Sequence, residues 1–148
     1  MKKLGAKKEF RVYSDLALVQ KTSLEVLEFL KPLKLSDAVQ FDVRLCMEEA
    51  LINAMKYGNG LKKELPVDVS VVYDSDAICM DIQDEGPGFD VAALEDCTRK
   101  DNLLKGSGRG VFLIHRLMDK IEYNSKGNKV SMTKFLNEPA CRQAGRIK

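Results

Sequence analysis

The sequence contains a single histidine, His115, and none of its four cysteines forms a CxxC pair. A structural zinc site draws four Cys or His ligands from closely spaced positions, so no such site is expected. We expect Cys46, Cys79, Cys97 and Cys141 to be reduced thiols that pack as small apolar side chains.

The sequence also lacks a long apolar run and a strong excess of charge of one sign. No stretch approaches the roughly 20 apolar residues of a membrane span, and no apolar signal segment follows the basic start, MKKLGAKKEF. The 24 Lys and Arg residues against 22 Asp and Glu leave a net charge of +2. This balance excludes the uniformly basic surface of a general nucleic-acid binder. We therefore expect a cytoplasmic protein that contacts neither a membrane nor nucleic acid directly.

A length of 148 residues and 45% hydrophobic side chains predict one domain, spanning residues 1–148, with a sizeable core. We expect residues 9–136 to form the body of this domain. Residues 1–7 and 137–148, which lack a clear apolar pattern, are expected to be loosely ordered tails.

The spacing of apolar residues predicts the order of helices and strands. Alternation of apolar and polar residues predicts strands over residues 9–13, 67–73, 78–82, 121–124 and 130–135. Helical spacing and capping residues predict helices over residues 16–30, 36–57 and 111–119. This order predicts an α+β fold, a two-layer sandwich with helices on one face of a mostly antiparallel sheet.

The helix predicted over residues 36–57 carries a narrow polar stripe made of Asp42, Glu49, Asn53 and Lys56. Glu49 and Asn53 are four residues apart and therefore point the same way. Apolar neighbours are expected to withdraw Glu49 partly from water, which would make it a better proton acceptor. Taken alone, the stripe is more typical of an ordinary Glu–Lys surface pair on an amphipathic helix. Several apolar side chains fall on the side expected to face solvent: Phe41, Leu45, Leu51, Ile52 and Met55.

A second motif, Asp84-Glu85-Gly86-Pro87-Gly88, directly follows the strand predicted over residues 78–82. A carboxylate at a strand end can accept a hydrogen bond from an exocyclic amine such as that of adenine. Gly86 and Gly88 permit a ligand to approach the backbone closely. Taken alone, the pentapeptide is also typical of a tight turn with no ligand.

A third motif, Gly106-Ser107-Gly108-Arg109-Gly110, precedes the helix predicted over residues 111–119. Its glycines expose backbone N–H groups at a helix N-terminus, which is a favourable place for phosphate, and Lys105 and Arg109 add cations. It matches neither the Walker loop nor the Rossmann fingerprint, so it is a weak signal by itself.

Together, E-x-x-x-N on a helix, D-x-G-x-G after a strand and G-x-G-x-G before a helix resemble the Bergerat-type ATP-binding fold of gyrase, the histidine kinases and the mismatch-repair ATPases. The segment 49–53 matches the N box of that superfamily, 84–88 its adenine box and 108–110 its lid-closing glycine box. The short chain and the run GRGVFLIHRLMDKIEYNSKGNKV are most similar to stand-alone serine-protein kinases that double as anti-sigma factors.

The resemblance implies a role for each matching residue. Asn53 would coordinate Mg²⁺ that bridges the ATP phosphates, Glu49 would be the general base toward a protein hydroxyl, and Asp84 would bind the adenine amine. Residues 89–105 would form a lid. Further nucleotide contacts are implied for Lys56, Gly86, Gly88, Lys105, Gly106, Ser107, Gly108, Arg109 and Gly110.

The resemblance further implies an ATP-dependent serine/threonine protein kinase that acts as an anti-sigma factor. Its partners would be a small anti-anti-sigma protein of the STAS type, a sigma factor, or both, and it could self-associate as a homodimer. Two alternatives remain: a non-catalytic ATP-binding switch and a detached histidine-kinase catalytic domain. His115 lies on an apolar helix, which disfavours the second alternative and indicates a structural residue.

The sequence departs from the family at two places. Tyr57 stands before Gly58 where relatives often have histidine, and Asn128 and Lys129 stand where relatives often have threonines that help to hold adenine. The resemblance therefore does not imply that residues of the final strand contact adenine.

Overall fold

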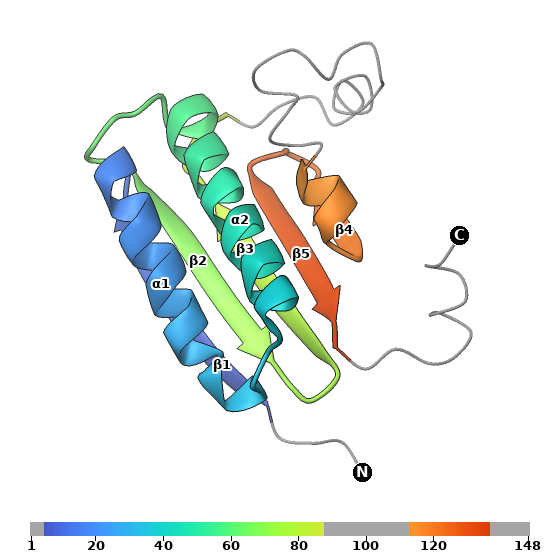
Figure 1. The fold of residues 1–148 in the computed structure, drawn as a ribbon. Coiled ribbons are helices and arrows are strands. Elements are labelled where there is room, and N and C mark those ends of the chain that lie inside the picture. The colour runs from blue at the N-terminus through green and yellow to red at the C-terminus, as the bar shows by residue number, and fades with distance from the viewer. Residues whose placement is uncertain (1–4, 88–112, 137–148) are drawn as a thin grey trace.

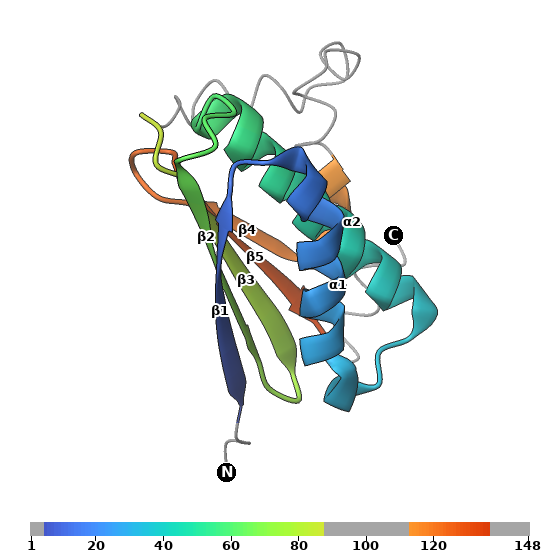
Figure 2. The same cartoon turned by 90° about the vertical axis from the view of Figure 1, so that its left-hand side faces the viewer.

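A computed structural model describes residues 5–87 and 113–136 of the chain. Within these residues one antiparallel sheet has the strand order β1-β2-β3-β5-β4. Its strands are β1 (Ala6–Tyr13), β2 (Pro66–Tyr73), β3 (Ala77–Gln83), β4 (Lys120–Tyr123) and β5 (Lys129–Phe135). The long helices α1 (Val19–Phe29) and α2 (Asp37–Asn53) pack on the same face of this sheet (Figure 1, Figure 2). The predicted α+β architecture is confirmed.

Short helical turns join these elements. The 3-10 turn η1 (Leu16–Leu18) leads into α1, and the Asp15 side chain caps it by accepting a hydrogen bond from the Ala17 N–H at 3.0 Å. The 3-10 turn η2 (Lys31–Leu33) follows α1 and ends at Lys34, which has a φ of 52°. Residues 113–117 are helical and precede β4, so they form the described part of the helix predicted over residues 111–119.

Strand β1 is longer than the sequence pattern predicts. It begins at Ala6 rather than Glu9, so residues 6 and 7 belong to the sheet and not to a loose tail. The physical reason is the length of β2, which pairs with β1 in register from Ala6–Tyr73 to Tyr13–Pro66. The prediction failed because residues 7–9 are all charged and carry no alternation.

Helix α2 begins at Ser36, whose side chain accepts a hydrogen bond from the Val39 N–H at 3.2 Å. The expectation that Leu51 and Met55 face solvent is wrong, because both are fully buried. The sheet covers one side of α2 and α1 covers a second, so a wider arc of the helix is buried than a single interface requires. Phe41, in contrast, is 62% exposed, as expected.

The core lies between the inner face of the sheet and these two helices. Its fully buried members come from alternate strand positions and from the facing sides of the helices: Val26, Leu30, Val43, Met47, Leu51, Met55, Val67, Val69, Val71, Ile78, Met80, Ile82 and Met132. Cys46 is also buried, and burial raises the pKa of its thiol to about 12, whereas the pKa of the half-buried Cys79 is shifted in the same direction. Both are free thiols, as predicted, and Cys97 and Cys141 lie outside the described residues.

Candidate functional site

Three segments far apart in the sequence meet at one end of the sheet. They are the C-terminal end of α2, the loop that follows β3, and the turn between β4 and β5 (Figure 1). The predicted Glu49 and Asn53 lie on the first segment, and Asp84 and Gly86 on the second. The fold therefore brings two of the three predicted motifs to the same region.

Asp84 is held by hydrogen bonds on its backbone and on one carboxylate oxygen. Its N–H donates to the Asn128 carbonyl at 2.9 Å, and its own carbonyl accepts from Asn128 Nδ2 at 3.2 Å. Its Oδ1 accepts from the Gly86 N–H at 2.8 Å. Within residues 5–87 and 113–136 no donor is bonded to Oδ2.

The electrostatic environment of Asp84 favours its neutral form. Burial is the main cause, and it raises the pKa of the carboxyl above its usual value. The hydrogen bond from Gly86 opposes this shift, the nearby charge of Glu85 adds to it, and Lys126 lowers the pKa slightly. A donor that approached Oδ2 would stabilise the ionised form and offset the cost of burying the charge.

Two glycines make room for this carboxylate. A side-chain Cβ on Gly58 would overlap Cγ and both oxygens of Asp84. A Cβ on Gly86 would collide with the carbonyl group of Gly58 and lie 3.0 Å from Asp84 Oδ1. The loop therefore packs backbone to backbone against the end of the helix at Gly86, and the Asp84 carboxylate packs against the backbone of Gly58.

Gly58 reaches this position because α2 ends in a π-helical turn, η3 (Ala54–Gly58). The Asn59 N–H bonds to the Ala54 carbonyl at 2.8 Å, which is the wide i to i+5 spacing of a π-helix. The helix predicted to run to Tyr57 therefore exists, but its last turn is wider than an α-helix. Such widened turns occur frequently at functional sites.

Asn59 joins this turn to the rest of the fold and is only 2% exposed. Its Nδ2 donates to Ser14 Oγ at 2.9 Å and to the Pro66 carbonyl at 3.0 Å. Its Oδ1 accepts from the Glu85 N–H at 2.7 Å. One buried amide therefore fixes the loop after β3 to the start of β2 and to the end of β1.

The polar stripe of α2 leads toward this loop. Glu49 and Asn53 are both half-buried, and neither side chain has a hydrogen bond to any residue that the structure describes. The carboxylates of Asp42 and Glu49 both raise the pKa of the Cys46 thiol between them. Lys56, one turn beyond Asn53, is exposed, and its Nζ lies 5.5 Å from the ring centre of Tyr57.

Asp42 is bound to a buried lysine. Lys134 is 5% exposed, and its Nζ lies 3.3 Å from Asp42 Oδ2 and donates to the Leu117 carbonyl at 3.0 Å. This cation joins α2 and β5 to the end of the helical segment 113–117. It thereby fixes the helix that follows the glycine-rich motif.

The remaining predicted site residues lie outside the described residues. They are Gly88, Lys105, Gly106, Ser107, Gly108, Arg109 and Gly110, together with the lid predicted over residues 89–105. Within the described ranges no group of three His, Cys, Asp or Glu side chains could hold a metal ion.

Comparison with known proteins agrees with this geometry. A family model described as a histidine kinase-like ATPase domain matches residues 12–134. The chain belongs to this family. The serine-protein kinase RsbW of Staphylococcus aureus strain MSSA476 is 30% identical in an alignment of length 113 that covers 70% of this chain and 70% of the relative. RsbW of strain bovine RF122 / ET3-1 is 28% identical, and its alignment also covers 70% of this chain and 70% of the relative.

Family membership and the sheet topology together make this a Bergerat-type, kinase-like ATPase domain that binds ATP. Among the described helices, none has the length and apolar character that crossing a membrane requires.

Sequence reasoning missed two residues of this site. Asn59 belongs to none of the sequence motifs, and Asn128 stands out in the sequence only as a departure from the family, although each contacts the loop that carries Asp84. For Lys134 a signal was available, because the alternation of Val130 and Met132 places this lysine on the buried face of β5.

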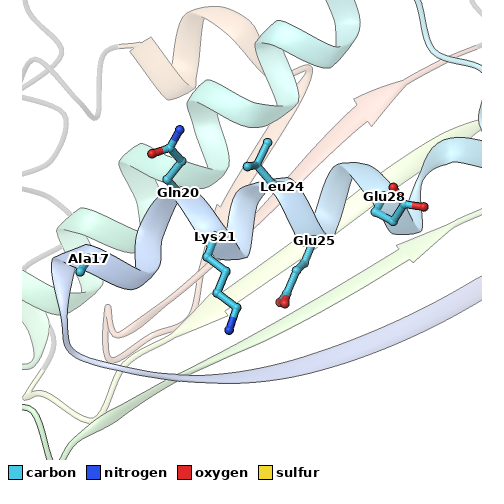
Figure 3. Close-up of a pocket in the computed structure, with 6 residues that line it drawn as sticks. All are labelled: Ala17, Gln20, Lys21, Leu24, Glu25 and Glu28. Carbon is cyan, nitrogen blue, oxygen red and sulfur yellow. The ribbon is translucent and has the colours of Figure 1, made fainter.

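A separate surface depression lies on the outer side of the first helix (Figure 3). It is lined by Ala17, Gln20, Lys21, Leu24, Glu25 and Glu28. All six belong to one stretch of η1 and α1, and none belongs to the three motifs. The depression is therefore distinct from the candidate ATP site.

Proposed function

We propose that this kinase-like ATPase is an ATP- and Mg²⁺-dependent serine/threonine protein kinase that acts as an anti-sigma factor in the cytoplasm. Its substrate would be a small anti-anti-sigma protein of the STAS type, and its regulatory target a sigma factor. The relatives are named serine-protein kinases and align over 70% of both chains. The observation that carries the proposal is a half-buried acid, Glu49, one turn from Asn53 on the helix that ends at the Asp84 loop.

The residues present fit an adenine ring. Asp84 Oδ2 has no donor among the described residues, and the carboxylate is half-buried against the backbone of Gly58. An exocyclic amine would supply the missing donor. Gly86 and Gly88 would flank the base.

The residues present also fit a magnesium nucleotide. The amide oxygen of Asn53 is a hard, neutral ligand, suited to a Mg²⁺ ion that keeps several waters and phosphate oxygens as its other ligands. When bound, the ion would neutralise charge on the phosphates. Lys56 and the glycine-rich motif, with Lys105, Gly106, Ser107, Gly108, Arg109 and Gly110, would supply the remaining phosphate contacts.

Glu49 would accept the proton of the partner's serine or threonine hydroxyl. A bond forms between that oxygen and the γ-phosphorus, while the bond from the γ-phosphorus to the bridging oxygen of ADP breaks. The chain's own contribution is thus to orient the hydroxyl and to receive one proton.

The test is Glu49→Gln, which keeps the size of the side chain and removes its basicity. We expect ATP to bind as in the wild type, while phosphate transfer from labelled ATP to a STAS-type partner falls by about 100-fold or more. Glu48→Gln is the matched control. Glu48 is the adjacent acid, but it bonds to Ser23 at 2.6 Å and to Arg44 at 3.1 Å, away from the stripe, so transfer should stay close to normal.

Wild-type transfer by Glu49→Gln would show that Glu49 is not the base. A wild-type protein that binds ATP but labels no partner in a single turnover would be a non-catalytic switch. Acid-labile phosphate on the chain itself would instead indicate a detached histidine-kinase domain.

A further inference from the structure

Asn128, at the turn between β4 and β5, is bonded to the backbone of Asp84 on both sides. Its carbonyl accepts from the Asp84 N–H at 2.9 Å, and its Nδ2 donates to the Asp84 carbonyl at 3.2 Å. Asn128 is 8% exposed, so these bonds are shielded from water. This pair of bonds determines where the backbone of Asp84 lies after β3 ends.

The orientation of the Asn128 amide follows from its neighbour Asn124. Asn124 Oδ1 accepts the backbone N–H groups of Gly127, Asn128 and Lys129 at 2.8, 3.0 and 3.2 Å. The other end of that side chain, Nδ2, must therefore face Asn128, and it donates to Asn128 Oδ1 at 2.7 Å. This leaves Asn128 Nδ2 as the only end of the amide that can face Asp84.

Each polar end of the Asn128 side chain thus already has a protein partner, Asn124 at Oδ1 and the Asp84 carbonyl at Nδ2. We propose that Asn128 is a positioning residue, which acts on adenine only through Asp84 by fixing the backbone from which the Asp84 carboxylate projects. The inference rests on the proposed ATP site and specifies how this chain recognises the 6-amino group of the base.

The substitution Asn128→Asp tests this role because it keeps the shape of the side chain. It replaces the Nδ2 donor with an oxygen that faces the Asp84 carbonyl, so one hydrogen bond is lost and two acceptors oppose each other. The matched control is Ser125→Asp, which adds the same charge to an exposed position of the same turn. Asn128→Ser serves as a second variant, since it removes the donor without adding charge.

The readout is the affinity of the full-length protein for two nucleotides by calorimetry. One is ATP, and the other is purine riboside triphosphate, in which hydrogen replaces the 6-amino group. We expect Asn128→Asp to weaken ATP binding about fivefold, the usual value of one hydrogen bond. Binding of the analogue, which offers no donor to Asp84, should stay within about twofold of the wild type by the same reasoning. Asn128→Ser should lower the ATP preference in the same direction, and Ser125→Asp should leave it unchanged.

Equal losses for the two nucleotides in both Asn128 variants would make Asn128 merely structural and would overturn the inference. An unchanged ATP preference in either folded variant would overturn it too. A wild-type protein that binds no ATP, or binds the analogue equally well, would instead refute the proposed adenine site itself, so the two failures are distinguishable.

Discussion

The contact between Gly58 and Asp84 allows a single methyl group to test the adenine site. In Gly58→Ala, the three atoms nearest to the new Cβ would all belong to the Asp84 carboxylate, which it would overlap. The Asp84 backbone cannot retreat, because Asn128 holds it on both sides. We therefore expect the carboxylate to rotate away and to lose its bond from the Gly86 N–H.

The expected change in stability is small because two effects oppose each other. Losing a hydrogen bond to a charged group costs about 1.5–3 kcal/mol. Gly58 lies in a helical turn with no positive φ, so alanine recovers about 1 kcal/mol of helix propensity. The net loss is about 1 kcal/mol, or about 2–4 °C in Tm for a domain of this size.

The expected change in ATP affinity is much larger. The rotated carboxylate can no longer accept a bond from the adenine amine, and a charge-assisted bond of about 1.5–3 kcal/mol corresponds to a loss of about 10- to 100-fold. Calorimetric titration with ATP measures this loss, and thermal unfolding followed by circular dichroism measures the Tm.

Gly60→Ala is the control for a general loss of stability. Gly60 has a φ of +62°, and a Cβ added to it would meet no atom within 4 Å. Alanine there costs about 1 kcal/mol of backbone strain, yet it touches no part of the site, so ATP affinity should not change. In an Asp84→Ala background, Gly58→Ala should also have little further effect on affinity. If the losses of ATP affinity in Gly58→Ala and Asp84→Ala simply added in the double variant, this account of the site would be refuted. Equal ATP affinities for Gly58→Ala and the wild type would refute it as well.

Two further predictions concern buried charge. Lys134→Met removes the cation that pairs with Asp42, whose side chain is 22% exposed, and that donates to the Leu117 carbonyl. Denaturant unfolding should therefore show a free energy of unfolding that is lower by about 2–3 kcal/mol. As a control, Arg11→Met removes an exposed pair with Asp68 and should leave the Tm unchanged. The raised pKa of Asp84 predicts a pH dependence of ATP binding. Because the amine bonds to the ionised carboxylate, the affinity for ATP should rise as the pH increases through that raised pKa. In the free protein the same ionisation lowers the free energy of unfolding, because it places a charge in a partly buried site. The profile should be flat in Asp84→Asn, and an unchanged slope in that variant would assign the titration to another group.

Local patterns were sufficient to predict most of the fold. The period of two in β2 and β3 and the cap at Ser36 are properties of neighbouring residues, so the sequence displays them directly. The burial of Leu51 and Met55 was not predictable in this way, because it depends on α1 covering a second side of α2. The first residues of β1 likewise become a strand only because β2 offers them partners.

The candidate site likewise contains some residues that local sequence patterns reveal and others that only the folded chain reveals. Glu49, Asn53 and Asp84 could be named from motif spacing, since each motif lies within one segment. Asn59 and Asn128 could not, because their bonds to the Asp84 loop cross 26 and 44 residues of sequence. Their side chains show no pattern of their own, and only the folded chain reveals what they hold.

The candidate site has two parts, the residues around Asp84 and the polar stripe of α2, and they differ in how firmly the described residues hold their side chains. Asp84 is fixed from three directions, by Asn128, by the Gly86 N–H and by the packing of Gly58, and Asn59 anchors the next residue along. Groups held in this way lose little conformational freedom when a ligand arrives, which favours affinity and discrimination between bases.

Glu49 and Asn53, in contrast, have no hydrogen bonds to residues in the described ranges. Within the described part of the chain α2 alone determines their positions, and in the proposed mechanism a bound nucleotide and partner complete their orientation. Under the proposed function, variants around Asp84 should therefore change ATP affinity, whereas variants of the α2 stripe should change the rate of transfer after binding. This separation explains why Gly58→Ala and Glu49→Gln are expected to have opposite signatures, although both residues lie on the same helical run.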